Sequence, residues 1–380
     1  VMKRKVKKLR RRMTPFLIAL AMLATVVVGY QFCPANPTPS LYLAAQDAWE
    51  QVRSFLAGGQ PASPTQEPPS ALGTDGGIQV FFAPAASLDP WGIDKRIVQL
   101  IRSAQHSVDC AFYELQLEAV SDALMERHRA GVSVRIVSDS HYESRPAVQA
   151  CIRAGIPIVF DQRSAFMHNK FCVVDGIHVW SGSTNITENG MYRNNNNAVW
   201  VVSPELAANF TTEFAEMFLN RKFGASSPRN TPHPVLMLGG IVIENYFAPE
   251  DGVGREIISE IEDARRRIDF MVFAFTCRDI AQALAARMAA GVEVRGLIEA
   301  RNAGSKHSQH RFLEQHGAEI HLDKNPFNMH HKVMILDRKT VITGSYNFSR
   351  NADTQNDENV IIIHDPGVAE NYLREMESLL

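Results

Sequence analysis

The sequence predicts an α/β protein built from two pseudo-symmetric α/β/α halves that share one active site at their interface. An internal repeat relates residues 78–225 to residues 240–380, with matching segments offset by about 160 positions. Strand-like runs alternate with amphipathic helical segments within each copy. One constellation of polar residues also recurs in both copies. A basic N-terminus with an apolar run (1–32) and a linker (33–77) precede the halves.

The N-terminal segment has the features of a membrane anchor. Residues 1–12 carry eight Lys and Arg and no acid, and residues 16–32 carry no charge. This apolar run is at the short end of what a helix needs to cross a bilayer. We therefore expect an N-terminal transmembrane helix in the cell membrane, single-pass, with the catalytic body outside the cytoplasm. The same features fit a signal peptide, which would give a secreted protein after cleavage.

The segment that follows is expected to be a linker. Residues 41–57 carry apolar side chains at helical spacing and predict a short amphipathic helix. Residues 58–77 are rich in Gly, Pro, Ser and Thr, which is typical of a flexible tether. The folded body is therefore expected to begin near Ile78.

Charge and cysteine content limit the classes of ligand. The chain has a net charge of −2, but the basic residues 1–12 mask an acidic body. Such a body is not typical of proteins that hold long nucleic acid through phosphate contacts, although a local basic groove keeps nucleic acid open as a partner. The five cysteines form no cluster at metal-ligand spacing. We predict no metal and no cofactor.

Each half predicts the same order of elements. A strand in the Phe-Ala-Pro segment is followed by a helix, a buried strand, a second helix and a third strand. A β-hairpin, a further strand and a terminal helix complete the half. The clearest pairs are the strands 80–84 and 245–249, the first helices 93–105 and 253–265, and the terminal helices 204–219 and 366–379.

The hairpin segments carry the repeated polar pattern H-x-K-x4-D-x6-G-S-x-N. Its members are His168, Lys170, Asp175, Gly182, Ser183 and Asn185 in the first half, and His330, Lys332, Asp337, Gly344, Ser345 and Asn347 in the second. In a strand, residues two apart face the same side, so each histidine lies beside its lysine and His331 points away. A single H-x-K is a weak signal; the repeat at equal spacing makes the pattern specific.

These residue types predict a pocket for an anion such as a phosphodiester. The lysines supply positive charge, and the serine hydroxyls and asparagine amides supply hydrogen-bond donors. Two histidines facing one another can serve as nucleophile and general acid. The attacking histidine must be neutral and the other protonated, so their environments must differ. Asp175 and Asp337 end a strand and open a turn, where an aspartate typically caps or pairs locally.

The doubled motif resembles the signature of the phospholipase D superfamily, with its two HKD motifs, in the compact bacterial phospholipase D or nuclease-like form. The resemblance covers residues 78–380. It implies a two-step reaction through a phosphohistidine that needs no metal. One of His168 and His330 would attack phosphorus, and the other would protonate the leaving alcohol. The phosphate oxygens would be held by Lys170, Lys332, Asn185 and Asn347, helped by Ser183 and Ser345.

An asymmetry between the halves favours one histidine as the nucleophile. Glu358 aligns with Asn196, and the resemblance implies an acid at this position that accepts a hydrogen bond from the histidine of the opposite half. Glu358 would then orient His168, which we expect to attack, while His330 meets only Asn196. The predicted catalytic residues are His168, Lys170, Asp175, His330, Lys332, Asp337 and Glu358, and the predicted substrate-binding residues are Ser183, Asn185, Ser345, Asn347 and Asn196.

The superfamily contains phospholipases, phosphatidyl transferases and nucleases, and the catalytic residues do not separate them. The acidic body and the expected anchor favour phospholipid hydrolysis. Cardiolipin-synthase-type phosphatidyl transfer comes second, because another alcohol can replace water, and metal-independent endonuclease activity third. A non-enzymatic scaffold is disfavoured because both histidines and both lysines are in place. No obligate protein partner is predicted.

Overall fold

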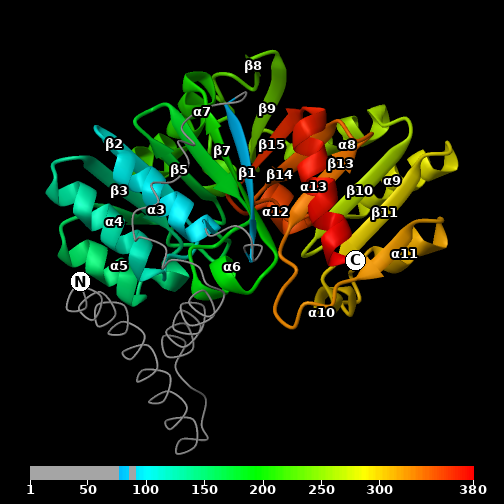
Figure 1. Cartoon of the computed structure of the whole chain (residues 1–380), viewed down its shortest axis with the longest axis horizontal. Helices are drawn as coiled ribbons and strands as arrows, with labels where there is room; N and C mark the ends of the chain where they lie inside the picture. Colours follow the sequence, from blue (N-terminus) through cyan, green and yellow to red (C-terminus); the bar gives the residue numbers. More distant parts are fainter. Residues whose placement is uncertain (1–76, 85–90) are drawn as a thin grey trace, which may run out of the picture. The chain divides into compact units, whose positions relative to one another are not determined.

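The computed structural model describes residues 77–84 and 91–380. These residues belong to one compact unit, which contains a seven-stranded and an eight-stranded sheet (Figure 1). The predicted anchor, amphipathic helix and most of the tether lie outside the described residues.

The first half forms the seven-stranded sheet, in the order β1-β7-β6-β5-β2-β3-β4. Its strands are β1 (Ile78–Ala83), β2 (Ser107–Phe112), β3 (Ser133–Ser138), β4 (Ile158–Phe160), β5 (Lys170–Val174), β6 (His178–Gly182) and β7 (Asn196–Val202). Its helices are α3 (Ile93–Ser103), α4 (Glu118–Arg129), α5 (Pro146–Arg153), α6 (Glu188–Tyr192) and α7 (Pro204–Asn220), with short 3-10 turns at Ser140–Tyr142 and Gly224–Ser226. The strands β2, β3 and β4 are parallel, and the other pairs are antiparallel.

The second half repeats this sheet and adds β8 at its edge, in the order β12-β11-β10-β13-β14-β15-β9-β8. Its strands are β8 (Val235–Leu238), β9 (Ile241–Ala248), β10 (Arg267–Val272), β11 (Glu293–Ile298), β12 (Glu319–Leu322), β13 (Lys332–Leu336), β14 (Thr340–Gly344) and β15 (Glu358–His364). Its helices are α8 (Val253–Asp263), α9 (Arg278–Ala289), α10 (Ala300–Ala303), α11 (His310–Gln315), α12 (Arg350–Thr354) and α13 (Pro366–Leu379). The predicted two-half α/β fold is confirmed.

Three apolar clusters explain how the layers pack. Two lie within single halves, where helices such as α3 bury their apolar stripe (Ile93, Ile97, Leu100 and Ile101) against the outer face of a sheet. The third cluster draws side chains from both sheets and from α7 and α13. This shared core joins the inner faces of the two halves, and it fixes the two hairpin segments relative to one another.

The terminal helices α7 and α13 begin with the same local signal. Ser203 and Asp365 are the N-cap residues, and their side chains accept hydrogen bonds from the backbone N–H of Leu206 and Val368. A proline follows each cap, where its missing N–H costs no helical hydrogen bond. The repeat therefore starts both interface helices at equivalent positions.

The predicted localisation needs correction. No helix within residues 77–84 and 91–380 is long and apolar enough to cross a lipid bilayer. The longest of these helices, α7, has 17 residues and carries Glu205, Glu213 and Glu216. The single-pass membrane protein expected from the sequence is therefore not supported, and the segment 16–32 that suggested it lies outside the described residues.

Candidate functional site

The two motif histidines lie just before β5 and β13, and each is held by the backbone of the opposite half. The His168 N–H donates to the carbonyl oxygen of Asp357, at 2.9 Å. The His330 N–H donates to the carbonyl oxygen of Asn195, at 2.8 Å. Asp357 directly precedes β15, which pairs with β9, and Asn195 directly precedes β7, which pairs with β1. The site is therefore assembled crosswise.

The side chains repeat this crossing. The Nδ1 atom of His168 lies 2.8 Å from a carboxylate oxygen of Glu358, and the Nδ1 atom of His330 lies 2.9 Å from the amide oxygen of Asn196. Both partners are acceptors, so each Nδ1 carries a proton and each Nε2 remains for chemistry. The Nζ atom of Lys332 lies beside the same ring, 3.2 Å from the Nε2 and 3.4 Å from the Nδ1 of His330.

The two lysines are buried beside the histidines. The Nζ atom of Lys170 donates to the His168 carbonyl, at 2.6 Å, and lies 4.9 Å from the ring centre of Tyr113. The Nζ atom of Lys332 donates to the His330 carbonyl, at 2.9 Å, and lies 5.2 Å from the ring centre of Phe273. Burial lowers the pKa of Lys170 to about 7. Burial and the charge of Lys170 hold the pKa of Lys332 well below its ordinary value.

Two aromatic side chains pack against the motif histidines, and the sequence analysis did not identify them. The rings of Tyr113 and Phe273 meet those of His168 and His330 edge to face, with centres 4.7 and 4.6 Å apart. Both aromatic residues directly follow the equivalent strands β2 and β10. That shared place in the repeat was the signal that could have identified them.

The electrostatics of the site favour an anionic ligand. Burial lowers the pKa of His168 to about 4, although Glu358 opposes the shift. Burial, the two lysines and His168 hold the pKa of His330 well below its ordinary value. Burial alone would raise the pKa of Glu358, but His168 and Lys170 keep it low, so this residue supplies a carboxylate. Four basic groups thus share one directly bonded carboxylate, and burial disfavours the protonated form of each of them. A bound anion would favour the protonated forms.

The serines of the motif lie behind the groups that touch the histidines. The Ser183 hydroxyl donates to the amide oxygen of Asn196, at 2.9 Å, and the Ser345 hydroxyl donates to a Glu358 oxygen, at 2.7 Å. Because each hydroxyl proton is already engaged, Ser183 and Ser345 orient these acceptors. Their predicted assignment to substrate binding stays a prediction, and so does that of Asn196, whose amide nitrogen donates to the Gly190 carbonyl.

The asparagines Asn185 and Asn347 occupy equivalent places after the two hairpins. The amide oxygen of each is buried and has no hydrogen-bond partner among the described residues. A buried amide without a partner costs free energy unless a ligand or water completes it. These two amides therefore remain available for a ligand.

The motif aspartates lie away from the histidines, at the opposite ends of β5 and β13. Asp175 accepts three backbone N–H groups from residues 105–107, each at 2.8 Å. Asp337 accepts the equivalent three from residues 265–267, at 2.7 to 3.0 Å. These bonds hold the pKa of both carboxyls below the ordinary value, although burial opposes the shift. Their predicted catalytic role stays a prediction; in the structure both carboxylates fasten the hairpin to the loop before the central strand.

The motif glycines allow two strands to approach closely. A Cβ atom on Gly182 would lie 2.4 Å from the Asn197 carbonyl oxygen, and one on Gly344 would lie 2.2 Å from that of Asn359. Both residues have a positive φ, of 145° and 148°. The glycines therefore let β6 and β14 meet β7 and β15, which carry Asn196 and Glu358.

A layer of polar groups lies beneath the site and also crosses between halves. The Asn359 amide donates to the amide oxygen of Asn169, at 2.7 Å. At the equivalent place the Asn197 amide nitrogen lies 3.1 Å from the Nδ1 of His331. His331 is fully buried, so it is a support residue rather than a surface group.

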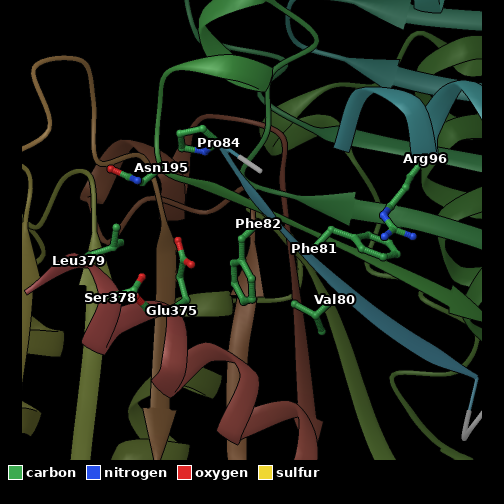
Figure 2. A pocket seen from close by; sticks show the side chains of 9 residues that line it. All are labelled: Val80, Phe81, Phe82, Pro84, Arg96, Asn195, Glu375, Ser378 and Leu379. Atoms are coloured by element: carbon green, nitrogen blue, oxygen red, sulfur yellow. The ribbon is translucent and has the colours of Figure 1, made fainter. Parts of the chain in front are cut away.

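A separate cavity of about 490 Å³ lies between β1 and the end of α13 (Figure 2). It is lined by Val80, Phe81, Phe82, Pro84, Arg96, Asn195, Glu375, Ser378 and Leu379. None of the motif histidines, lysines or asparagines lines it. Its lining residue Asn195 binds the His330 N–H through its carbonyl, and Phe82 and Glu375 contact His331 beneath the site. The chemistry therefore belongs to the histidine cluster and not to this cavity.

Comparison with known proteins connects this cluster to a family. The family model described as "Cardiolipin synthase, PLD-like domain" matches residues 97–218 and 257–380, one segment in each half. A phospholipase D of Rickettsia felis is 34% identical over 161 residues, which are 42% of this chain and 80% of that protein. A mitochondrial cardiolipin hydrolase of Chlamydomonas reinhardtii is 30% identical over 125 residues, 32% of this chain and 56% of that protein.

A solved structure resembles both halves at once. The phosphatidylserine synthase of Haemophilus influenzae matches with a TM-score of 0.62 over 79% of this chain and 85% of that chain. The sequence identity is 15%, so this likeness concerns the fold.

Proposed function

Since the chain belongs to the phospholipase D superfamily, we propose that it is a phosphodiesterase that hydrolyses phospholipids through a covalent phosphohistidine. One observation carries the proposal: each motif histidine has its Nδ1 bound by an acceptor of the opposite half, Glu358 for His168 and Asn196 for His330. This arrangement leaves two Nε2 atoms in a buried site that is rich in cations, as in-line attack on a phosphodiester requires.

In the first step, the Nε2 atom of His168 attacks phosphorus. A nitrogen–phosphorus bond forms and the ester bond to the headgroup oxygen breaks. The leaving alcohol takes a proton from the Nε2 of His330. Glu358 is 2.8 Å from the Nδ1 of His168 and stabilises the positive charge that develops on that ring.

In the second step, His330 acts as a base. Its Nε2 takes a proton from water while the water oxygen attacks phosphorus. The nitrogen–phosphorus bond breaks, and the phosphatidic acid leaves with His168 restored. His330 is then protonated again for the next cycle.

Binding of the substrate supplies the protonation state that the first step needs. In the free site burial and the lysine charges disfavour protonated His330. An anionic phosphodiester adds a negative charge between Lys170 and Lys332 and favours the imidazolium. Asn185 and Asn347, whose amide oxygens have no partner among the described residues, would donate to the remaining phosphate oxygens through their amide nitrogens.

The lipid substrate is supported by the relatives, which are named phospholipase D and cardiolipin hydrolase. A phosphatidyl transferase is the second candidate, because the matching family model is described as cardiolipin synthase. Transfer uses the same phosphohistidine, with an alcohol in place of water in the second step. The acidic body disfavours a nuclease.

The experiment offers the chain phosphatidylglycerol or phosphatidylcholine vesicles, with or without added glycerol, beside single-stranded DNA, all with EDTA present. We expect headgroup release, no DNA cleavage, and loss of turnover in His168→Ala and His330→Ala. His331→Asn is the matched control, because Asn169 holds the equivalent place in the first half, and it should keep most of the turnover. Cleavage of DNA without lipid turnover would overturn the substrate assignment. Full activity in both alanine variants would overturn the mechanism.

The choice of nucleophile is tested by trapping the intermediate. The adduct is denatured in alkali and then mapped to a peptide, because the nitrogen–phosphorus bond of a phosphohistidine is stable in base and labile in acid. We expect the phosphoryl group on the peptide that contains His168. Its recovery on the peptide that contains His330 would reverse the two roles.

A further inference from the structure

A second cluster of titratable side chains lies on the outer face of the second sheet. It consists of Glu244 in β9, Glu260 in α8 and His364 at the end of β15. One ligand atom from each lies within 4.8 Å of the others, and all three are partly buried. Glu358 begins β15 and His364 ends it, so about 20 Å of strand separates this cluster from the histidine site.

The contacts fix the imidazole and one carboxylate. The Nε2 atom of His364 lies 2.8 Å from one oxygen of Glu244, and its Nδ1 lies 3.0 Å from the hydroxyl of Thr340. The Tyr246 hydroxyl donates to the other oxygen of Glu244, at 2.6 Å. When the Nδ1–H donates to Thr340, a neutral His364 turns a lone pair toward the carboxylates. A cation, either a proton or a metal ion, must then lie between them.

A second carboxylate raises the demand for that cation. The Glu260 carboxylate is partly buried, and one of its oxygens lies within 4.8 Å of the ligand atoms of Glu244 and His364. Asp263 adds negative charge and Lys339 adds positive charge nearby. A histidine–glutamate ion pair needs only one carboxylate, and a second partly buried one is costly unless another charge is bound.

The internal repeat shows that the fold does not require these groups. By the strand register, Glu244 and His364 correspond to Gln79 and Val202 in the first half. Helices α3 and α8 align from their first residues, which places Leu100 opposite Glu260. Three positions that carry no charge in one half thus carry two carboxylates and an imidazole in the other. All three substitutions are to metal-ligand types, in one cluster.

We propose that Glu244, Glu260 and His364 bind one Zn²⁺ ion. One imidazole nitrogen and two carboxylate oxygens are a ligand set that suits this metal, and they leave a coordination position for water. Thr340 and Tyr246 would hold the ligands from behind. The ion would fasten α8 to the strands β9 and β15, so its role is to stabilise the second half.

The test uses the full chain, stripped with a chelator and dialysed. Zn²⁺ alone is titrated by calorimetry, and the melting temperature is recorded with and without about 50 µM Zn²⁺. We expect one bound equivalent and a higher melting temperature that EDTA reverses. Neither measurement depends on turnover, so the result stands apart from the proposed phosphodiesterase activity.

The first half supplies the matched variants, since Glu260→Leu and His364→Val introduce its residues at these positions. Both should abolish the stoichiometric binding and the response of the melting temperature, and Glu260→Gln should weaken binding in a nearly isosteric background. The control is His321→Ala, which removes an exposed histidine that lies 2.7 Å from Glu319 and should leave binding intact. The proposal would be overturned if His364→Val bound Zn²⁺ as well as the unaltered chain does, or if His321→Ala lost binding. It would also be overturned if Zn²⁺ did not raise the melting temperature of the unaltered chain.

Discussion

Replacing Glu358 by Gln removes one charge from the site while nearly keeping its shape. The Glu358 carboxylate is fully buried, 2.8 Å from the Nδ1 of His168 and 2.7 Å from the Ser345 hydroxyl. A glutamine can accept both hydrogen bonds through its amide oxygen, and it loses only the longer bond that the other Glu358 oxygen accepts from the Asn356 amide, at 3.2 Å. The variant therefore isolates the contribution of the negative charge to the positive charge that forms on His168 during attack.

The size of the effect follows from Coulomb's law. Two unit charges about 4 Å apart interact by about 4 kcal/mol at an effective dielectric constant of about 20. A neutral hydrogen bond that persists in the variant returns about 1 kcal/mol. The remaining loss of about 3 kcal/mol corresponds to a decrease in kcat of about 10²-fold. The pKa of His168 should also fall further, which moves the acid limb of the pH–rate profile to lower pH.

The assay is single-turnover formation of the phosphohistidine from a phospholipid in detergent micelles, measured as a function of pH. The matched control is Asp357→Asn, which neutralises the adjacent, equally buried carboxylate. Asp357 accepts from Gly224 at 2.5 Å and pairs with Arg163, away from the ring of His168, so its loss should lower stability more than rate. A rate within threefold of the unaltered chain in Glu358→Gln, with the acid limb in place, would refute the assigned role.

Three further outcomes test other parts of the structure. Asp175→Asn should lower the free energy of unfolding, measured by urea denaturation, by about 2 kcal/mol, because the Asp175 carboxylate accepts three N–H groups. The folded fraction should keep its specific activity. Unchanged stability would contradict the fastening role. Burial and the neighbouring Glu250 raise the pKa of Glu213, and burial raises that of Glu250 to about 8. The protonated forms of these two residues therefore stabilise the fold below pH 4.5, and this contribution is lost as the pH rises to 8. Glu213→Gln should accordingly raise the free energy of unfolding at pH 8 and leave it unchanged at pH 4. Urea denaturation at the two pH values measures the difference. Finally, inorganic phosphate should bind with uptake of protons near pH 7.5, because the anion raises the pKa of Lys170 and Lys332. The uptake is measured by calorimetry in two buffers of different ionisation enthalpy. Identical heats of binding in the two buffers would exclude this coupling.

Much of the fold was accessible from the sequence because the chain contains it twice. The repeat marked the limits of the helices α3, α8, α7 and α13 to within two residues. It also identified Glu358 opposite Asn196, and the side chains of both reach the histidine of the other half. Two copies with equal spacing place equivalent residues at equivalent positions of the fold, and a single copy does not give this information.

Some hydrogen-bond partners of the predicted site residues could not be read from the sequence, for a physical reason. Spacing along a strand tells which face a residue occupies, but not which of several polar neighbours takes its hydrogen bond. Ser183 and Ser345 were expected to bind phosphate, yet their hydroxyls serve Asn196 and Glu358. Tyr113 was missed for the opposite reason, since an aromatic residue after a buried strand is ordinarily taken for core.

The crosswise assembly has a consequence for how such a site can change over generations. Two separate, identical half-chains that paired in this way would have to present the same residue to both histidines, so any substitution would appear on both sides at once. Joining the copies in one chain removes that restriction. Glu358 and Asn196 occupy equivalent positions and differ. The outer faces of the two sheets can differ in the same way, as Glu244, Glu260 and His364 do from their equivalents in the first half. Because the two halves are joined in one chain, equivalent positions can carry different residues and take different roles.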